Sequence, residues 1–171
     1  VGCVEAPRGT LTHHYWTDSR GEGPVRSEAR GGASKSDVVI SPNEIYYPKA
    51  MGLDLLLAMT QEALDKYYPD LKPGGTLVVD TTLVTEFPTE NYYGLPFTRL
   101  AREEVGHIMV ANVIALAAIA GLTGIVSRDA LTDSVLQRAP RGTEEKNKAA
   151  IEIGFREAAK NQEGVRKRII E

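Results

Sequence analysis

Hydrophobic and polar positions change their pattern several times along the chain, and each change predicts a different element. Residues 53–59 (LDLLLAM) are a nearly continuous apolar run, which is typical of a strand buried on both faces of a parallel sheet. Thr60 follows as a helix N-cap, and residues 61–68 have a helical pattern that the Pro-Gly turn at 72–75 ends. Residues 76–80 (TLVVD) predict the next strand. Strand, helix and strand in this order predict a βαβ unit with parallel strands and a right-handed crossover.

The rest of the chain after this unit is predicted to be a loop followed by helices. Residues 109–121 are Ala-rich and apolar on every side, which fits a helix packed on a sheet. Ser127 is suited to cap the next helix, and Thr143 opens the last one. The expected helices cover residues 99–105, 109–121, 127–136 and 143–160. The pattern as a whole predicts an α/β three-layer sandwich, with a largely parallel or mixed central sheet, helices on both faces and a helical C-terminal half.

The N-terminal residues have a different texture from the remainder. We expect one domain over residues 1–171, of which residues 1–26 are atypical and loop-rich. They hold at most one short strand, near residues 11–16. Residues 38–40 are a short β-branched run that predicts a further strand, which the turn at 41–43 (SPN) ends.

Composition narrows the class of protein. A formal net charge of −3 argues against a general nucleic-acid binder. The single cysteine, Cys3, excludes an internal disulfide and a cysteine-based metal site within the chain. The longest uninterrupted apolar run, residues 113–120, is too short to cross a membrane. No targeting segment is visible, so we expect a cytoplasmic globular protein.

Candidate catalytic groups are few. His13 and His14 are adjacent in a polar segment, where solvent exposure is the expected state, and His107 is more typical of a helix cap or a core residue than of a general base. The chain has no nucleophile elbow and no metal-ligand spacing, so we predict no catalytic residue and no metal ligand. Three tyrosine pairs, at 46–47, 67–68 and 92–93, suit either an interface or ordinary half-buried packing.

The most informative segment is residues 27–36 (SEARGGASKS). Its two adjacent glycines, Gly31 and Gly32, let backbone amides approach a ligand closely, and Arg30 and Ser34 add donors suited to a phosphate or carboxylate. A plain glycine-rich turn before a strand is the alternative. Nucleotides in open α/β sheets bind at the carboxyl ends of strands, whereas this loop precedes its strand, so it is not a Rossmann phosphate loop by position.

The order of these segments resembles the gamma subunit, or gamma domain, of the 2-oxoacid:ferredoxin (acceptor) oxidoreductases. The resemblance covers residues 27–160, and its 2-oxoglutarate branch is the most similar. The segments that carry it are EARGGASKSDVVIS at 28–41, the I-x-Y-P-K step at 45–49, DLLLAMTQEALDKY at 54–67, LKPGGTLVVD at 71–80, VANVIALAAIAGLTG at 110–124 and NKAAIEIG at 147–154.

This resemblance implies an accessory role in the oxidative decarboxylation of a 2-oxoacid, expected to be 2-oxoglutarate, to an acyl-CoA, with electrons passed to ferredoxin. Thiamine diphosphate and iron–sulfur clusters would be held by alpha, beta and delta partner subunits, and the chain alone would bind none and be inactive. The gamma domain would help to enclose coenzyme A. Carried over to this chain, Arg30, Gly31, Gly32 and Ser34 would face the shared active site, with Arg30 as the anion contact.

The chain departs from the family pattern before Ser27. The family begins with a strand and a G-x-G-G-Q-G loop that opens a long helix, and this chain has no such segment there. Where the family has SYGPEARGG, this chain has GPVRSEARGG at residues 23–32. Two alternatives stay open from the sequence: a class I methyltransferase-like fragment, suggested by the strand-helix-PGG-strand order, and a non-catalytic ligand-binding module.

Overall fold

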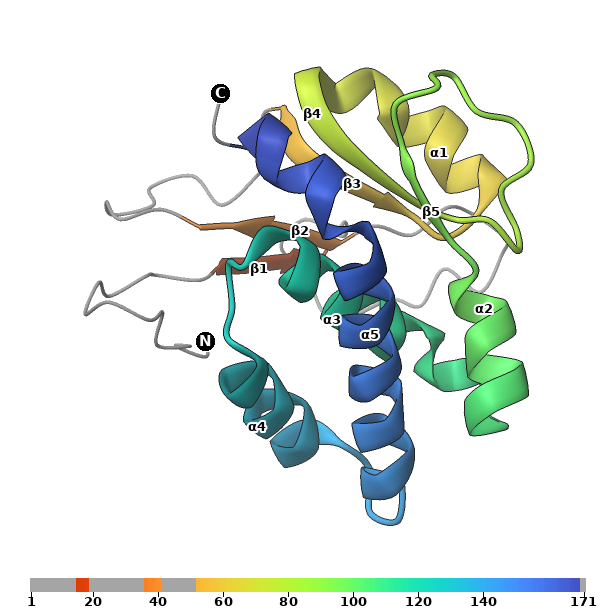
Figure 1. Ribbon diagram of the computed structural model, residues 1–171, viewed down its shortest axis with the longest axis vertical. Helices are drawn as coiled ribbons and strands as arrows, with labels where there is room; N and C mark the ends of the chain where they lie inside the picture. The colour runs from red at the N-terminus through yellow and green to blue at the C-terminus, as the bar shows by residue number, and fades with distance from the viewer. Residues whose placement is uncertain (1–14, 19–35, 41–51, 170–171) are drawn as a thin grey trace.

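The computed structural model describes residues 15–18, 36–40 and 52–169, with side chains described for 36–40 and 52–161 (Figure 1). The strands are β1 (Tyr15–Asp18), β2 (Ser36–Val39), β3 (Leu53–Ala58), β4 (Leu71–Asp80) and β5 (Tyr93–Leu95). The helices are α1 (Gln61–Tyr67), α2 (Phe97–Leu100), α3 (Ala111–Thr123), α4 (Arg128–Arg138) and α5 (Glu144–Ile169). Shorter helical segments are the 3-10 turns η1 (Tyr68–Asp70) and η3 (Ile108–Val110) and the π-helical segment η2 (Ala101–Val105).

A parallel sheet with the strand order β3-β4-β5 forms the centre of the molecule. Helix α1 connects β3 to β4, so the predicted βαβ unit is confirmed. Thr60 is the N-cap of α1, since its hydroxyl oxygen accepts a hydrogen bond from the amide of Ala63 at 3.2 Å. β1 and β2 pair antiparallel as a second, two-stranded sheet.

Alternation along the strands sends side chains to two covered faces of the parallel sheet. On one face Leu77 and Val79 pack with α1, and on the other Val78 packs with α2, α3 and α5. Figure 1 shows α1 on one side of the sheet and the α3–α5 pair on the other. The predicted three-layer α/β fold is therefore confirmed, including its helical C-terminal half.

Small residues bring α3 and α5 into close contact. A Cβ atom added at Gly154 would come within 2.6 Å of the Ala117 Cβ and 2.9 Å of the Ala118 amide nitrogen, and one added at Gly121 would come within 2.7 Å of the Ala158 Cβ. The two helices can approach this closely only because these positions carry no larger side chain. The glycines thus set the distance between the two longest packed helices of this layer.

Several predicted boundaries differ from the structure. The predicted turn at 72–75 lies inside β4, where the register with β3 shifts between Leu53 and Leu55 and leaves the extra residues as a bulge. β5 lies in a segment predicted to be loop, because three residues are too few to show alternation. The helix predicted over 99–105 is α2 continued by the π-helical η2, and α5 runs past residue 160 to Ile169.

The N-terminal predictions are tested only in part. The strand expected near residues 11–16 lies at Tyr15–Asp18, and that expected at 38–40 lies at Ser36–Val39. The remaining N-terminal predictions, on residues 1–14 and 19–35, lie outside the described residues, and the expectation of a single domain stays a prediction. Within the described parts of the chain, no helix is both long enough and apolar enough to cross a membrane.

Candidate functional site

The parallel sheet has one edge at which polar side chains gather, and it is the edge where all three strands end. β3, β4 and β5 end at Ala58, Asp80 and Leu95. Because the strands are parallel, the segments that follow them meet at this edge, and ligands of open α/β sheets bind there. We call this region the strand-end edge.

Asp80, at the end of the central strand, organises the strand-end edge. It is fully buried, and its Oδ2 accepts hydrogen bonds from the Thr98 amide at 2.9 Å and the Thr98 hydroxyl at 2.5 Å. Its Oδ1 accepts one from the amide of Thr82 at 2.9 Å. Thr98 is in the first turn of α2, so the negative charge lies where the helix dipole favours it. A single carboxylate therefore joins the loop after β4 to the helix after β5.

Gln61 fixes the same loop from the other side. Its Oε1 accepts hydrogen bonds from the amides of Thr85 and Glu86, each at 3.0 Å. Its Nε2 donates to the Glu86 carbonyl at 3.1 Å and to the Asp65 carboxylate at 2.9 Å. Every donor and acceptor of this side-chain amide is thus used, and the start of α1 is joined to the end of the loop.

These bonds decide what the strand-end edge can do chemically. The carboxylate of Asp80 and the amide of Gln61 are both directed at backbone and threonine groups of the protein, so they serve to position the loop. Within the described residues, no group of three His, Cys, Asp or Glu side chains could hold a metal ion. At this edge, Asp80 and Gln61 hold the loop after β4 to α2 and to the start of α1.

An ion-pair network joins η2 to α5 on the outer side of the helical layer. Arg156 contacts Glu104 at 2.8 Å and Glu157 at 3.0 Å, and Lys160 contacts Glu157 at 2.7 Å. Burial alone would raise the pKa of Glu157, but hydrogen bonds from Lys160 and Arg156 outweigh it and the pKa lies below its ordinary value of 4.5. The hydrogen bonds that Arg156 donates to the carboxylates of Glu104 and Glu157 raise its pKa. Because the pKa of Glu157 is lowered in the folded state, its charge stabilises the fold at pH values above its unfolded-state pKa. That stability is lost as the pH falls through the folded-state pKa.

Only some of the candidate residues from the sequence lie within the described parts of the chain. Arg30, Gly31, Gly32 and Ser34 lie outside the described residues, so their predicted role stays a prediction; the described β2 does begin directly after their loop. His13, His14 and the tyrosine pair at 46–47 also lie outside.

The remaining candidates take structural places. His107 is half-buried and occupies the N-cap position of η3 without a side-chain capping bond. Tyr67, Tyr68 and Tyr92 are half-buried and pack against the cluster on the α1 face of the sheet. Tyr92 also stacks on Phe87, with ring centroids 4.2 Å apart. These contacts fit the packing alternative, and an interface role of the tyrosine pairs stays a prediction.

Asp80 and Gln61 are the residues that sequence reasoning missed. The sequence pattern predicts Asp80 only as the last residue of a strand and Gln61 only as the first residue of a helix. A signal did exist for Asp80, since an acidic residue that ends an apolar strand and is followed by Thr81 and Thr82 lies at the ligand edge of a parallel sheet. For Gln61 the bonds span 24 and 25 residues, and no local pattern indicates them.

Comparisons with known proteins agree with this architecture. A family profile described as "Pyruvate ferredoxin/flavodoxin oxidoreductase" matches residues 23–157. The chain is 46% identical over 132 residues to 2-oxoglutarate synthase subunit KorC of Methanocaldococcus jannaschii, covering 75% of this chain and 71% of that protein.

Two solved structures have the same fold. The gamma subunit of a keto/oxoacid ferredoxin oxidoreductase from Geobacter sulfurreducens PCA matches with a TM-score of 0.72 and 42% identity, over 87% of this chain and 82% of that one. A 2-oxoglutarate:ferredoxin oxidoreductase from Magnetococcus marinus, solved with 2-oxoglutarate, coenzyme A and succinyl-CoA bound, matches with a TM-score of 0.66 and 20% identity. That match covers 87% of this chain and 26% of the longer chain.

Proposed function

This chain belongs to the pyruvate ferredoxin/flavodoxin oxidoreductase family, and on that premise we propose that it is the gamma subunit of a complex that oxidises 2-oxoglutarate. The observation that carries the proposal is the 46% identity to a 2-oxoglutarate synthase subunit over 71% of that protein's length. The family profile also covers residues 53–80, whose strand-helix-PGG-strand order suggested a methyltransferase, and this match argues against that alternative.

The proposed reaction cleaves the bond between the carboxylate and the 2-oxo carbon of the substrate. The 2-oxoacid and coenzyme A yield CO₂, the acyl-CoA thioester and a proton, and the two electrons released pass to two ferredoxins. Thiamine diphosphate supplies the carbanion chemistry when it is bound to the complex.

Neither the cysteine content of the sequence nor the described residues supply the ligand sets that redox or thiamine chemistry commonly uses. A typical iron–sulfur cluster takes about four cysteine ligands, whereas this sequence has one cysteine, Cys3. No metal-holding cluster of His, Cys, Asp or Glu occurs among the described residues, and a diphosphate is commonly bound through a magnesium ion that carboxylates hold. We therefore assign both groups to partner subunits of alpha, beta and delta type.

The role proposed for this chain is to complete the coenzyme A side of the shared active site. The strand-end edge offers a preformed surface, because Asp80 and Gln61 hold its loop. The Arg30–Gly31–Gly32 loop, with Ser34, offers donors for a phosphate or carboxylate of the ligand. The coenzyme A bound in the solved relative from Magnetococcus marinus supports this ligand class.

The test is reconstitution of the complex from its co-expressed subunits, with and without this chain. We expect coenzyme A-dependent viologen reduction only when the chain is present, with a higher kcat/KM for 2-oxoglutarate than for pyruvate or a branched-chain 2-oxoacid. Full activity without the chain would contradict the accessory role. A preference for pyruvate would contradict the substrate assignment alone.

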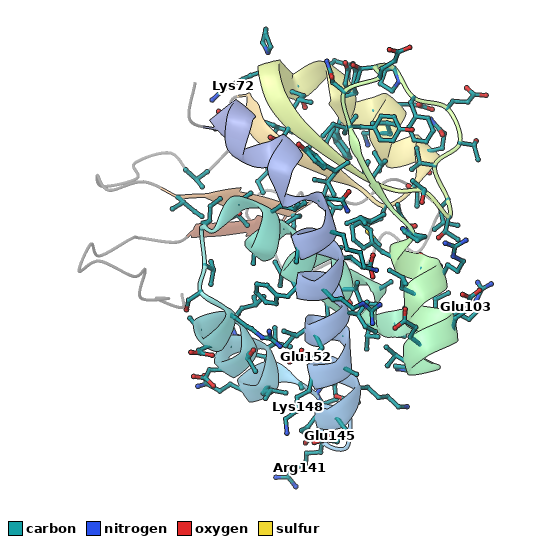
Figure 2. The ribbon with its side chains drawn as sticks, in the orientation of Figure 1. Lys72, Glu103, Arg141, Glu145, Lys148 and Glu152 are labelled. Carbon is teal, nitrogen blue, oxygen red and sulfur yellow. The ribbon has the colours of Figure 1, made fainter. Side chains whose placement is uncertain are left out.

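Arg30→Ala in the assembled complex tests the proposed coenzyme A contact. Loss of one charge-assisted hydrogen bond should raise the KM for coenzyme A about tenfold or more, and should leave the KM for the 2-oxoacid nearly unchanged. Arg141→Ala removes the same charge from the exposed connection between α4 and α5, away from the sheet, and is the matched control (Figure 2). Equal KM values for coenzyme A in the two variants would remove Arg30 from the site.

A further inference from the structure

Helix α3 has an apolar side that nothing in the described structure covers. Its other sides are buried against the sheet, α4 and α5. Residues at helical spacing continue outward from η3 along α3, and we call them the α3 outer face: Met109, Asn112, Leu116, Ile119 and Thr123. Met109 is 71% exposed and Leu116 is 41% exposed, and neighbouring Ile108 is 48% exposed. Large apolar side chains are therefore exposed in η3, directly before α3, and again at Leu116 in the middle of α3.

The polar members of the α3 outer face are directed at the chain itself. The Thr123 hydroxyl donates to the carbonyl of Ile119 at 2.7 Å. The Asn112 Oδ1 accepts from the amide of Val113 at 2.9 Å.

The absence of charge distinguishes this helix from an ordinary surface helix. No Asp, Glu, Lys or Arg occurs between Glu104 and Arg128 in the sequence. Helix α5 shows the contrast, because its exposed positions include Glu145, Lys148 and Glu152, which Figure 2 shows along its N-terminal half. A helix that faces water along one side normally carries charged or polar residues there. The α3 outer face instead has the composition of an obligate interface, which resembles a domain core cut in half.

We propose that the α3 outer face is the docking surface for a partner subunit of the same oxidoreductase, which presents an apolar, uncharged surface to it. The proposal rests on the proposed function, which requires partner subunits. The solved relative from Magnetococcus marinus supports this occupant, because there the same fold makes up 26% of a longer chain. In that relative the fold is joined to a large remainder of the same chain, and we expect a separate gamma subunit to make the corresponding contacts between chains.

The test compares Leu116→Glu and Met109→Glu with the wild-type chain in assembly with the co-expressed partner subunits. A carboxylate placed in a dry interface has no counter-charge, so we expect the dissociation constant of the complex to rise about tenfold or more for each variant. Gln137→Glu adds the same charge at an exposed position of α4 and should leave the constant unchanged. Circular dichroism of each variant chain checks that it is folded, and Met109, the more exposed residue, remains informative if Leu116→Glu lowers stability.

Three results would overturn the proposal. A wild-type complex that forms and is unaffected by both substitutions would remove this surface from the interface and leave the proposed function intact. A wild-type chain that does not assemble with 2-oxoacid oxidoreductase subunits would refute the proposed function together with this inference. Sedimentation that shows self-association of the isolated chain, abolished by Leu116→Glu, would identify the occupant as a second copy.

Discussion

The crossing of α3 and α5 and the Asp80 carboxylate of the strand-end edge are both buried, but the two regions are held together by different forces. At the crossing, Gly121, Ala117, Gly154 and Ala158 allow contact between helix backbones, and shape alone sets the distance. At the edge, the Asp80 carboxylate fixes segments that are far apart in sequence through directed hydrogen bonds. The helical layer that supports the site is therefore specified by side-chain volume, and the loop of the site by hydrogen-bond donors and acceptors.

This comparison predicts that the two regions fail under different substitutions. Added volume should damage the crossing, and loss of an acceptor should damage the edge. Three substitutions test the distinction. Asp80→Ala should lower the free energy of unfolding most, Gly154→Ala less, and Gln61→Ala least.

Asp80→Ala should have the largest effect. It leaves the amides of Thr82 and Thr98 and the Thr98 hydroxyl without their acceptor inside the protein, so the free energy of unfolding should fall by about 3 kcal/mol or more. Urea denaturation of the full chain measures the change. Asp133→Ala removes an exposed carboxylate of α4 as the control, and a loss of similar size there would show that the bonds of Asp80 are not the cause.

Gly154→Ala should come second and act through volume. The new methyl group would lie within 2.6 Å of the Ala117 Cβ, so α3 and α5 must separate. The gain in helix propensity is smaller than this cost, and we expect a net loss of about 2 kcal/mol. Ala159→Ser adds one atom at an exposed position of α5 and should change the stability by under about 0.5 kcal/mol. A stabilised Gly154→Ala variant would contradict the close crossing.

Gln61→Ala should have the smallest effect, because its partners lie near solvent and water can replace it. We expect a loss of about 1 kcal/mol, the net value of hydrogen bonds of this kind. The more specific readout is local: protease cleavage between Thr81 and Glu86 should become faster, and Gln137→Ala in α4 should leave it unchanged. Unchanged cleavage in Gln61→Ala would mean that Asp80 holds the loop by itself.

Elements with a strong local signal were predictable from the sequence. The apolar run of β3, the Thr60 cap of α1, the Ser127 cap of α4 and the apolar α3 are all confirmed. β5 was not predictable, because its three residues become a strand only by pairing with β4. The bulge at 72–75 was mistaken for a turn because proline and glycine favour both.

The site was less predictable than the fold, for a physical reason. Local patterns report burial and capping, whereas the bonds from Asp80 to Thr98 and from Gln61 to the loop after β4 join residues that are 18 to 25 positions apart. A carboxylate at the end of a strand indicates the strand-end edge of the sheet, but it does not indicate which residues form hydrogen bonds with that carboxylate. The role of Arg30 rests on resemblance to the family and stays a prediction.

The bond between Thr98 and Asp80 makes one amide a reporter of the whole edge. The Thr98 N–H is buried and donates to a buried carboxylate, so its hydrogen exchanges with solvent only when α2 separates from the end of β4. Its exchange rate therefore gives the free energy of that opening, in the isolated chain and in the assembled complex alike. A partner or ligand that binds at this edge would slow the exchange of this amide without any need to touch it.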